Sequence, residues 1–163
     1  MTNVAEEGRA YFLDTSALVK LYHEERGSKE VERLAADLTV PLVVSEIARI
    51  ELHSAFARKV REGHLTDAAF QEVLACFRED LDHRYQVVPV GAATFETAIG
   101  LLLQHGTTAP LRTLDALQIA SAKAVETSEL TFVTADTKLV TVASQVFARV
   151  MNPEQVDVPV DSG

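Results

Sequence analysis

The sequence lacks several features that would place it in a specialised class of protein. Its single cysteine, Cys76, excludes an internal disulfide framework and a zinc site built from cysteines. No apolar run approaches the roughly 18 residues that a membrane-spanning helix needs, and the acidic opening MTNVAEEGRA is unlike a signal peptide. We therefore expect a cytoplasmic protein, in a reducing compartment, with no membrane partner.

The chain also has a shortage of positive charge. Its 15 Lys and Arg are outnumbered by 24 Asp and Glu, which gives a net charge of −9 at pH 7. Because nucleic-acid binding relies on Lys and Arg against phosphate, such a chain can bind nucleic acid only through a local basic patch or through bridging cations. A hydrophobic content of 47% in 163 residues is typical of one globular domain with a proper core.

Short apolar runs alternate with longer helical patterns along most of the chain. The expected strands are residues 10–13, 41–44, 87–90, 131–134 and 147–151, and the expected helices are 15–22, 28–38, 46–62, 66–82, 92–105, 114–126 and 137–144. Nearly continuous apolar strands separated by helices predict an α/β/α sandwich with a central parallel sheet of about five strands. We expect residues 1–151 to form this single domain, with the helices from 46 to 82 as an αα-hairpin beside the sheet. Residues 152–163 are expected to form a flexible tail.

Four acidic residues stand apart from the ordinary surface charge. Asp14 and Asp136 each follow an expected strand where a helix begins, and Glu51 and Asp115 border or interrupt apolar helix faces. Each has a structural interpretation as well. Asp14 and Asp136 fit helix N-caps, Asp115 fits a first-turn partner of the helix dipole, and Glu51 fits a salt bridge with Arg58.

Together these acids predict a ligand site. Ligands of open α/β sheets bind outside the carboxyl ends of the strands. Four carboxylates that converge there raise one another's pKa, and the simple way to keep them ionised is a hard divalent cation such as Mg²⁺ or Mn²⁺.

The motifs around these acids resemble the PIN domain, and most closely the VapC-type toxin ribonucleases. The matching stretches are FLDTSALVK (12–20), IELHSA (50–55), LDALQIA (114–120) and FVTAD (132–136). The resemblance implies a PIN-like three-layer sandwich and an endoribonuclease that depends on Mg²⁺, with Mn²⁺ as a substitute. It also implies a cognate antitoxin as partner, in a type II toxin–antitoxin system, and a homodimer.

The resemblance assigns roles to individual residues. It implies that Asp14, Glu51, Asp115 and Asp136 are both catalytic and metal-binding, and that the hydroxyl of Thr15 or Ser16 belongs to the substrate site. For the RNA we expect contacts from Arg58, on the helix that carries Glu51, and from Lys20 and Arg112, which flank the other acids.

The resemblance also suggests how the antitoxin acts. We expect an arginine of the antitoxin to enter the acidic pocket, because a guanidinium can pair with two carboxylates. An apolar segment of the same partner is expected to cover Phe56, Phe70 and Phe77, unless these side chains complete the core or a homodimer interface.

Two other functions fit part of the pattern. An aspartate-nucleophile phosphatase would use Asp14, but that chemistry usually needs a second acid two residues on, where Ser16 stands. A receiver-like or interaction module that binds a cation without turnover accounts for Asp14 and Asp136. It leaves the apolar surroundings of Glu51 unexplained.

Overall fold

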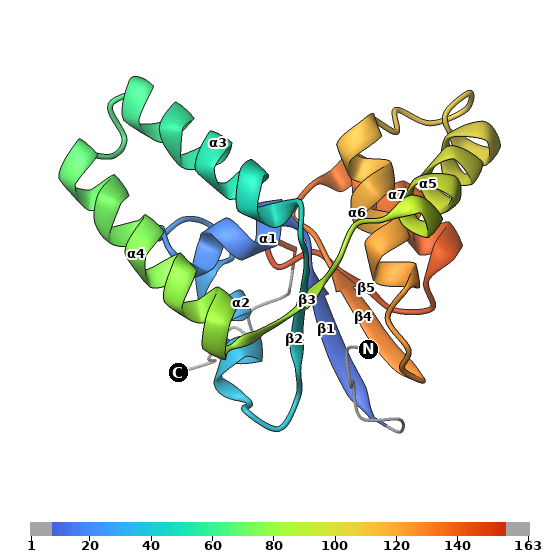
Figure 1. Cartoon of the computed structure of the whole chain (residues 1–163), viewed down its shortest axis with the longest axis horizontal. Coiled ribbons are helices and arrows are strands. Elements are labelled where there is room, and N and C mark those ends of the chain that lie inside the picture. Colours follow the sequence, from blue (N-terminus) through green and yellow to red (C-terminus); the bar gives the residue numbers. More distant parts are fainter. Residues whose placement is uncertain (1–7, 156–163) are drawn as a thin grey trace, which may run out of the picture.

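The computed structural model describes residues 8–155, which form a parallel sheet with helices on both faces (Figure 1). The strands are β1 (Arg9–Leu13), β2 (Leu42–Ser45), β3 (Tyr85–Val88), β4 (Glu129–Val133) and β5 (Val150–Met151). Every pairing is parallel, and the strand order is β3-β2-β1-β4-β5. The predicted three-layer sandwich around a five-stranded parallel sheet is confirmed.

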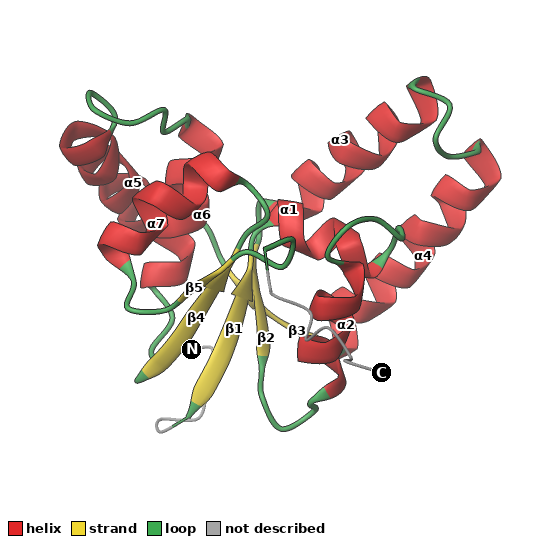
Figure 2. Ribbon diagram, turned by 180° about the vertical axis from the view of Figure 1, so that it is seen from behind, coloured by secondary structure: helices red, strands yellow, loops and turns green. Residues whose placement is uncertain are grey.

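The helices divide between the two faces of this sheet (Figure 2). One face carries α1 (Thr15–Leu18), the 3₁₀ turn η1 (Val19–Leu21), α2 (Ser28–Ala36), α3 (Ala48–Arg61) and α4 (Asp67–His83). The other carries α5 (Ala92–His105), α6 (Thr113–Lys123) and α7 (Thr137–Val146). Helices α3 and α4 form the hairpin that was predicted for residues 46–82, and this hairpin extends away from the sheet (Figure 1). Among residues 8–155, no helix is both long and apolar enough to span a membrane.

Each face of the sheet has its own hydrophobic core, because successive residues of a strand point to opposite faces. In β1, Phe12 packs toward α5–α7 and Leu13 toward α1–α4, and both are fully buried. Phe12 stacks on Phe132 of β4 with the ring centroids 5.5 Å apart. Two covered faces explain why these strands read as continuous apolar runs.

The chain beyond β5 turns back onto the domain. Asn152 and Pro153 are buried, and a Cβ on Gly27 would lie 3.1 Å from the backbone of Pro153. Gly27 also has φ = 85°, which favours glycine. Residues 152–154, expected to belong to a flexible tail, are thus packed onto the domain near the start of α2, and Gln155 is exposed. Residues 156–163 lie outside the described residues.

The order of the strands locates a site. From the central strand β1 the chain builds β2 and β3 on one side, then returns to build β4 and β5 on the other. The carboxyl ends of β1 and β4 are therefore a topological switch point, where parallel α/β sheets bind ligands. Asp14 directly follows β1, and Thr134, Ala135 and Asp136 directly follow β4.

Candidate active site

A pocket of about 500 Å³ opens at this edge of the sheet. All eight residues predicted for the site line it: Asp14, Thr15, Ser16, Glu51, Arg58, Arg112, Asp115 and Asp136. Arg61 and Gln118 line it as well, and sequence reasoning had assigned no role to Gln118. The fold thus brings residues from α1, α3, α6 and the end of β4 into one cavity, while their roles in catalysis and binding remain predictions.

Asp14 is the most deeply buried of the four acids, with 4% of its surface exposed. The hydroxyl of Ser16 donates to Oδ1 at 2.7 Å, the hydroxyl of Thr134 donates to Oδ2 at 2.6 Å, and the N–H of Ala17 donates to Oδ1 at 2.9 Å. Burial raises the pKa of Asp14 to about 6, against the lowering effect of these hydrogen bonds, and the negative charge of Glu51 adds to the rise. The carboxylate is therefore held rigidly but is costly to ionise.

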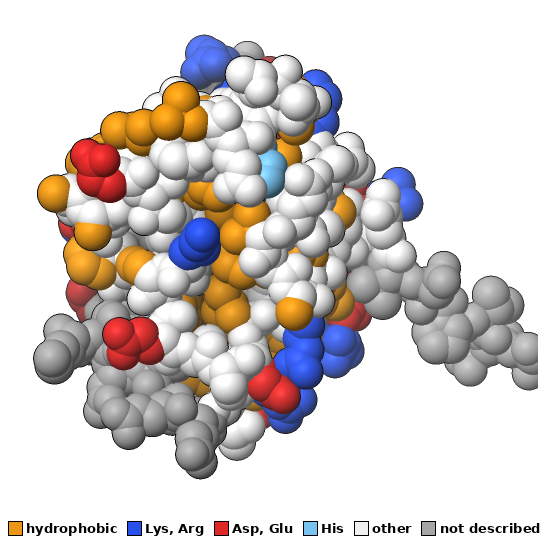
Figure 3. All heavy atoms as spheres, turned by 90° about the vertical axis from the view of Figure 1, so that its right-hand side faces the viewer, with side chains coloured by type: hydrophobic (Ala, Val, Ile, Leu, Met, Phe, Trp, Pro, Cys, Tyr) orange, Lys and Arg blue, Asp and Glu red, His pale blue; other side chains and the backbone are white. Residues whose placement is uncertain are grey.

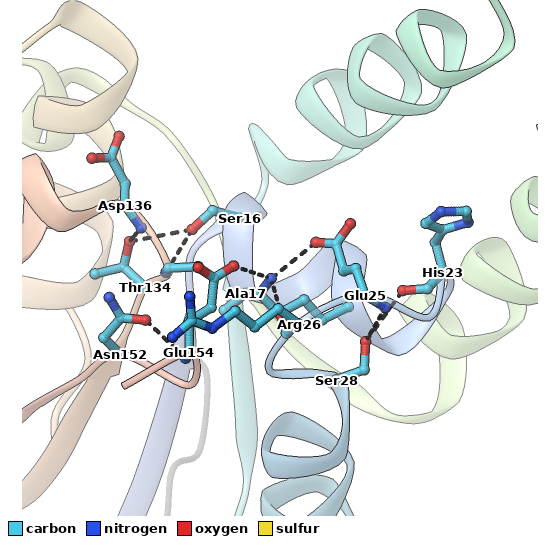
Figure 4. Close-up of polar contacts among 12 residues, drawn as sticks. Ser16, Ala17, His23, Glu25, Arg26, Ser28, Thr134, Asp136, Asn152 and Glu154 are labelled. Atoms are coloured by element: carbon cyan, nitrogen blue, oxygen red, sulfur yellow. Dashed lines mark hydrogen bonds and ion pairs between the residues drawn. The ribbon is translucent and has the colours of Figure 1, made fainter. Parts of the chain in front are cut away.

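The hydroxyls of Ser16 and Thr134 tie the ends of β1 and β4 together (Figure 4). Their oxygens lie 3.2 Å apart, Ser16 accepts the N–H of Ala135 at 2.9 Å, and Thr134 accepts the N–H of Asp136 at 3.1 Å. Sequence reasoning missed Thr134. The available signal was a hydroxyl residue at a strand end, two residues before Asp136 and opposite Asp14.

Glu51 lies on α3 and is held by two donors from other elements. The hydroxyl of Thr15 donates to its Oε1 at 3.2 Å, and the Gln118 amide donates to the same oxygen at 2.8 Å. Burial raises the pKa of Glu51, these hydrogen bonds lower it, and the charge of Asp115 raises it further. The interpretation of Glu51 as a salt-bridge partner of Arg58 is wrong, because Arg58 pairs with Glu62 at 4.0 Å instead.

The other two acids serve the starts of their helices, as their structural interpretations proposed. Asp136 caps α7 by accepting the N–H groups of Lys138 at 2.8 Å and Leu139 at 3.3 Å. Asp115 accepts the N–H of Arg112 at 3.2 Å in the first turn of α6. The Arg112 guanidinium also lies 3.5 Å from Asp115 and 3.9 Å from Asp136, so one cation approaches both acids.

The donors fit a hard divalent cation in chemical type, since every acid at the pocket offers carboxylate oxygens. The expected convergence of four carboxylates is nevertheless not seen. Within residues 8–155, no three acidic, histidine or cysteine side chains lie close enough together to hold one ion. Each acid instead turns toward hydrogen-bond donors of its own. The negative charge of Glu51 still raises the pKa of Asp14, and that of Asp115 raises the pKa of Glu51.

Lys20, expected to contact RNA, is buried and fully engaged. Only 2% of its side chain is exposed. Its ammonium donates to Glu25 at 2.9 Å, to the carbonyl of Arg26 at 2.7 Å and to Glu154 at 2.7 Å. This lysine anchors the segment after β5 to the chain beside α1, and the expectation of an RNA contact is wrong.

We expect Lys20→Met to destabilise the fold without changing how RNA binding depends on salt. Removing one partner from a buried ion pair typically costs 3–5 kcal/mol, and partial exposure of both glutamates reduces this to about 2–4 kcal/mol. Urea denaturation measures the first effect and a salt titration of RNA binding the second. A reduced salt slope with unchanged stability would restore Lys20 as an RNA contact.

The phenylalanines expected to offer a partner surface are mostly part of the core. Phe56 of α3 and Phe77 of α4 are 0% and 1% exposed and belong to the core on the α1–α4 face of the sheet. Phe70 is partly buried and packs against that core. The alternative that these side chains complete the core is therefore the correct one for Phe56 and Phe77.

These features define an α/β/α protein whose carboxylate-lined pocket lies at the switch point of its parallel sheet. Residues 11–145 match the PIN domain, so the chain belongs to the PIN domain family. No curated protein sequence matches it.

Solved structures with the same fold are distant in sequence. PAE2754 from Pyrobaculum aerophilum is 18% identical, with a TM-score of 0.61 over 86% of this chain and 82% of that one. A DNA-bound VapBC from Salmonella typhimurium is 16% identical, with a TM-score of 0.60 over 90% and 99% of the two chains. A toxin–antitoxin complex from Klebsiella pneumoniae is 19% identical, with a TM-score of 0.57 over 88% and 97%.

Proposed function

We propose that this PIN domain is a cytoplasmic, Mg²⁺-dependent endoribonuclease and the toxin of a type II toxin–antitoxin system. PIN domains are generally nucleases, and two of the compared structures are a toxin–antitoxin complex and a VapBC. The observation that carries the proposal is one pocket lined by four carboxylates and by three arginines, Arg58, Arg61 and Arg112. Cation-binding acids beside phosphate-binding cations are what hydrolysis of a phosphodiester requires.

In this proposal the acids bind the cation and the basic residues bind the RNA. Asp14, Glu51, Asp115 and Asp136 would have to turn toward Mg²⁺, or Mn²⁺ in its place, when the cation binds. The cation would supply an activated water and stabilise charge on the phosphate. Arg58 and Arg61 of α3 would contact the RNA backbone. Arg112 would exchange its acidic partners for a phosphate, since it is 79% exposed and only loosely paired.

The two exposed arginines supply a test of the RNA surface. In an Asp14→Asn background, which prevents cleavage, we expect Arg58→Gln with Arg112→Gln to weaken RNA binding and to flatten its dependence on salt. For two lost phosphate contacts to a single strand, the slope of log K against log salt falls by about 1.4. Fluorescence anisotropy at several salt concentrations measures the slope. Arg149→Gln is the matched control, because Arg149 pairs with Glu129 outside the pocket.

The antitoxin is proposed to silence the enzyme at the same pocket. A carboxylate-lined cavity favours a guanidinium, and Arg112 already shows that one arginine can approach Asp115 and Asp136 together. Co-expression with a candidate antitoxin tests this, since the complex should resist cleavage triggered by Mg²⁺. Inhibition that survives replacement of every arginine in the antitoxin's inhibitory segment would rule out this mechanism but not the partnership.

A homodimer is proposed from an apolar face of α5. Phe95, Ile99 and Leu103 follow one another at intervals of four residues and are 51%, 49% and 76% exposed. Exposed hydrophobic side chains are visible on the side of the molecule formed by α5–α7 (Figure 3). Such a stripe is typical of a helix that packs against another molecule. Light scattering gives the mass of two chains if the proposal holds.

One assay separates the nuclease from the two other functions considered. Pure protein is incubated with RNA, in Mg²⁺ and in EDTA, and the products are separated on a gel. Internal cleavage only in Mg²⁺ supports the nuclease. Release of terminal phosphate without chain cleavage would favour the phosphatase, and an unchanged RNA would favour a cation-binding module. The buried Asp14, with both oxygens hydrogen-bonded, already favours the nuclease over a nucleophilic aspartate.

A further inference from the structure

Gln118 stands out as a polar side chain on an otherwise buried helix. Every residue of α6 from Ala116 to Ala122 is buried, and Gln118 itself is 3% exposed. Its amide nitrogen donates to Glu51 Oε1 at 2.8 Å and to Thr15 Oγ1 at 3.0 Å. The Thr15 hydroxyl in turn donates to the same oxygen of Glu51 at 3.2 Å. One side chain of α6 therefore joins α1 and α3 at the pocket.

The orientation of the Gln118 amide follows from its neighbours. A flipped amide would place its carbonyl oxygen against the carboxylate of Glu51, where two acceptors repel, so the nitrogen must face Glu51. This orientation leaves Gln118 Oε1 buried without a hydrogen-bond partner in the described part of the chain. An orphaned buried carbonyl destabilises a fold. An apolar side chain would fill this position without that cost, so stability does not account for the glutamine.

The contact of Gln118 with Glu51 does account for the glutamine. Both donors converge on Oε1 of Glu51, while Oε2 accepts no hydrogen bond from any residue in the range 8–155. An amide is also neutral, so it orients the carboxylate and leaves its negative charge intact, whereas Lys or Arg would cancel that charge. Arg58, the salt-bridge partner expected from the sequence, pairs with Glu62 and does not compensate the charge of Glu51.

We infer that Gln118 is a positioning residue, which, with Thr15, fixes Glu51 by one oxygen and keeps the other free for a divalent cation. The inference rests on the proposed function for its cation. Partners that orient a metal-binding side chain typically change metal affinity 10- to 100-fold when they are removed. Gln118 is thus expected to act on the cation through Glu51 and not by direct contact.

The test uses Gln118→Met, which keeps the length of the side chain and removes both donors; Gln118→Leu replaces it if that variant does not fold. Ser121→Ala is the matched control, because Ser121 is also buried on α6 but bonds only to Ser45, at 2.8 Å. Calorimetry with Mn²⁺ should give binding about 10- to 100-fold weaker for Gln118→Met and near wild type for Ser121→Ala. In a Glu51→Gln background, Gln118→Met should have almost no further effect, since both changes act on the same ligand. Equal weakening in both backgrounds, or none in either, would overturn the inference and leave the nuclease proposal standing.

A second readout needs no cation. The side-chain carboxyl ¹³C resonance of Glu51, identified by its loss in Glu51→Gln, should move or broaden in Gln118→Met and stay in place in Ser121→Ala. If the resonance does not change, Gln118 does not position Glu51, whatever the protein does to RNA. If the resonance changes but the wild type binds no Mn²⁺, Gln118 does position Glu51. The proposed purpose of that contact and the nuclease proposal would then both be wrong.

Discussion

Asp14→Asn is expected to abolish RNA cleavage while making the metal-free protein more stable. The substitution keeps the shape of a side chain held by Ser16, Thr134 and Ala17, but it removes a proposed cation ligand. Loss of a direct ligand should exceed the effect of losing an outer partner, so we expect activity to fall at least about 100-fold. Because burial raises the pKa of Asp14 from 3.8 to about 6, its ionised form costs about 3 kcal/mol at neutral pH. The neutral amide avoids that cost.

The stability change has a definite dependence on pH. Below pH 3.8 both the folded and the unfolded wild type hold the proton of Asp14. Between this value and about 6 the unfolded chain has lost the proton and the folded chain retains it, so wild-type stability declines as pH rises through this range. Urea denaturation in EDTA should therefore show no gain for Asp14→Asn near pH 3.5 and a gain of about 1–3 kcal/mol at pH 7.5. A variant that is less stable than wild type at pH 7.5 would show that the hydrogen bonds of the carboxylate outweigh its burial.

Removal of Mg²⁺ is expected to produce the second large effect. A ligand at 100 times its dissociation constant stabilises the folded state by about 2.7 kcal/mol, and EDTA should remove that stabilisation together with the activity. The effect should shrink on acidification, because a cation must displace the proton from Asp14 once the pH falls below about 6. Each pH unit below that value should weaken binding by up to about tenfold for one displaced proton.

Thermal unfolding in Mg²⁺ and in EDTA, at pH 7.5 and at pH 5, measures this coupling. We expect a clear difference between Mg²⁺ and EDTA at pH 7.5 and a much smaller one at pH 5. Asp14→Asn serves as the control and should show little stabilisation at either pH. An equal Mg²⁺ effect at both pH values would mean that Asp14 takes no part in binding the cation.

The sequence predicted the architecture well because continuous apolar strands and helical periods are local patterns. The observed elements follow the expected ones closely in the first strand and in residues 92–105. The boundaries shift elsewhere. Strand β3 starts at Tyr85, before the expected residue 87, because pairing with β2 from Leu42 to Ser45 sets its register. Strand β5 covers only residues 150 and 151 of the expected 147–151, since the short edge pairing extends no further.

The site was predicted less completely, and the reason is physical. Acidic residues at strand ends are recognisable in a sequence, and this pattern identified Asp14 and Asp136. Acidic residues on apolar helix faces are recognisable too, and this pattern identified Glu51 and Asp115. Their partners were not, because a hydrogen bond between Thr134 and Asp14 joins residues 120 positions apart. The burial of Lys20 depends on Glu154, which is equally remote in sequence. Local composition gives no information about such contacts.

Single-turnover cleavage of RNA at limiting Mg²⁺ shows whether these carboxylates form the cation site of a nuclease. Asp115→Asn is the informative variant, because Asp115 lies at the pocket and is not in the core. We expect cleavage by the wild type, none in EDTA, and a loss of at least about 100-fold in Asp115→Asn that higher Mg²⁺ partly restores. Wild-type activity in Asp115→Asn at limiting Mg²⁺, or cleavage that persists in EDTA, would mean that these carboxylates are not the cation site.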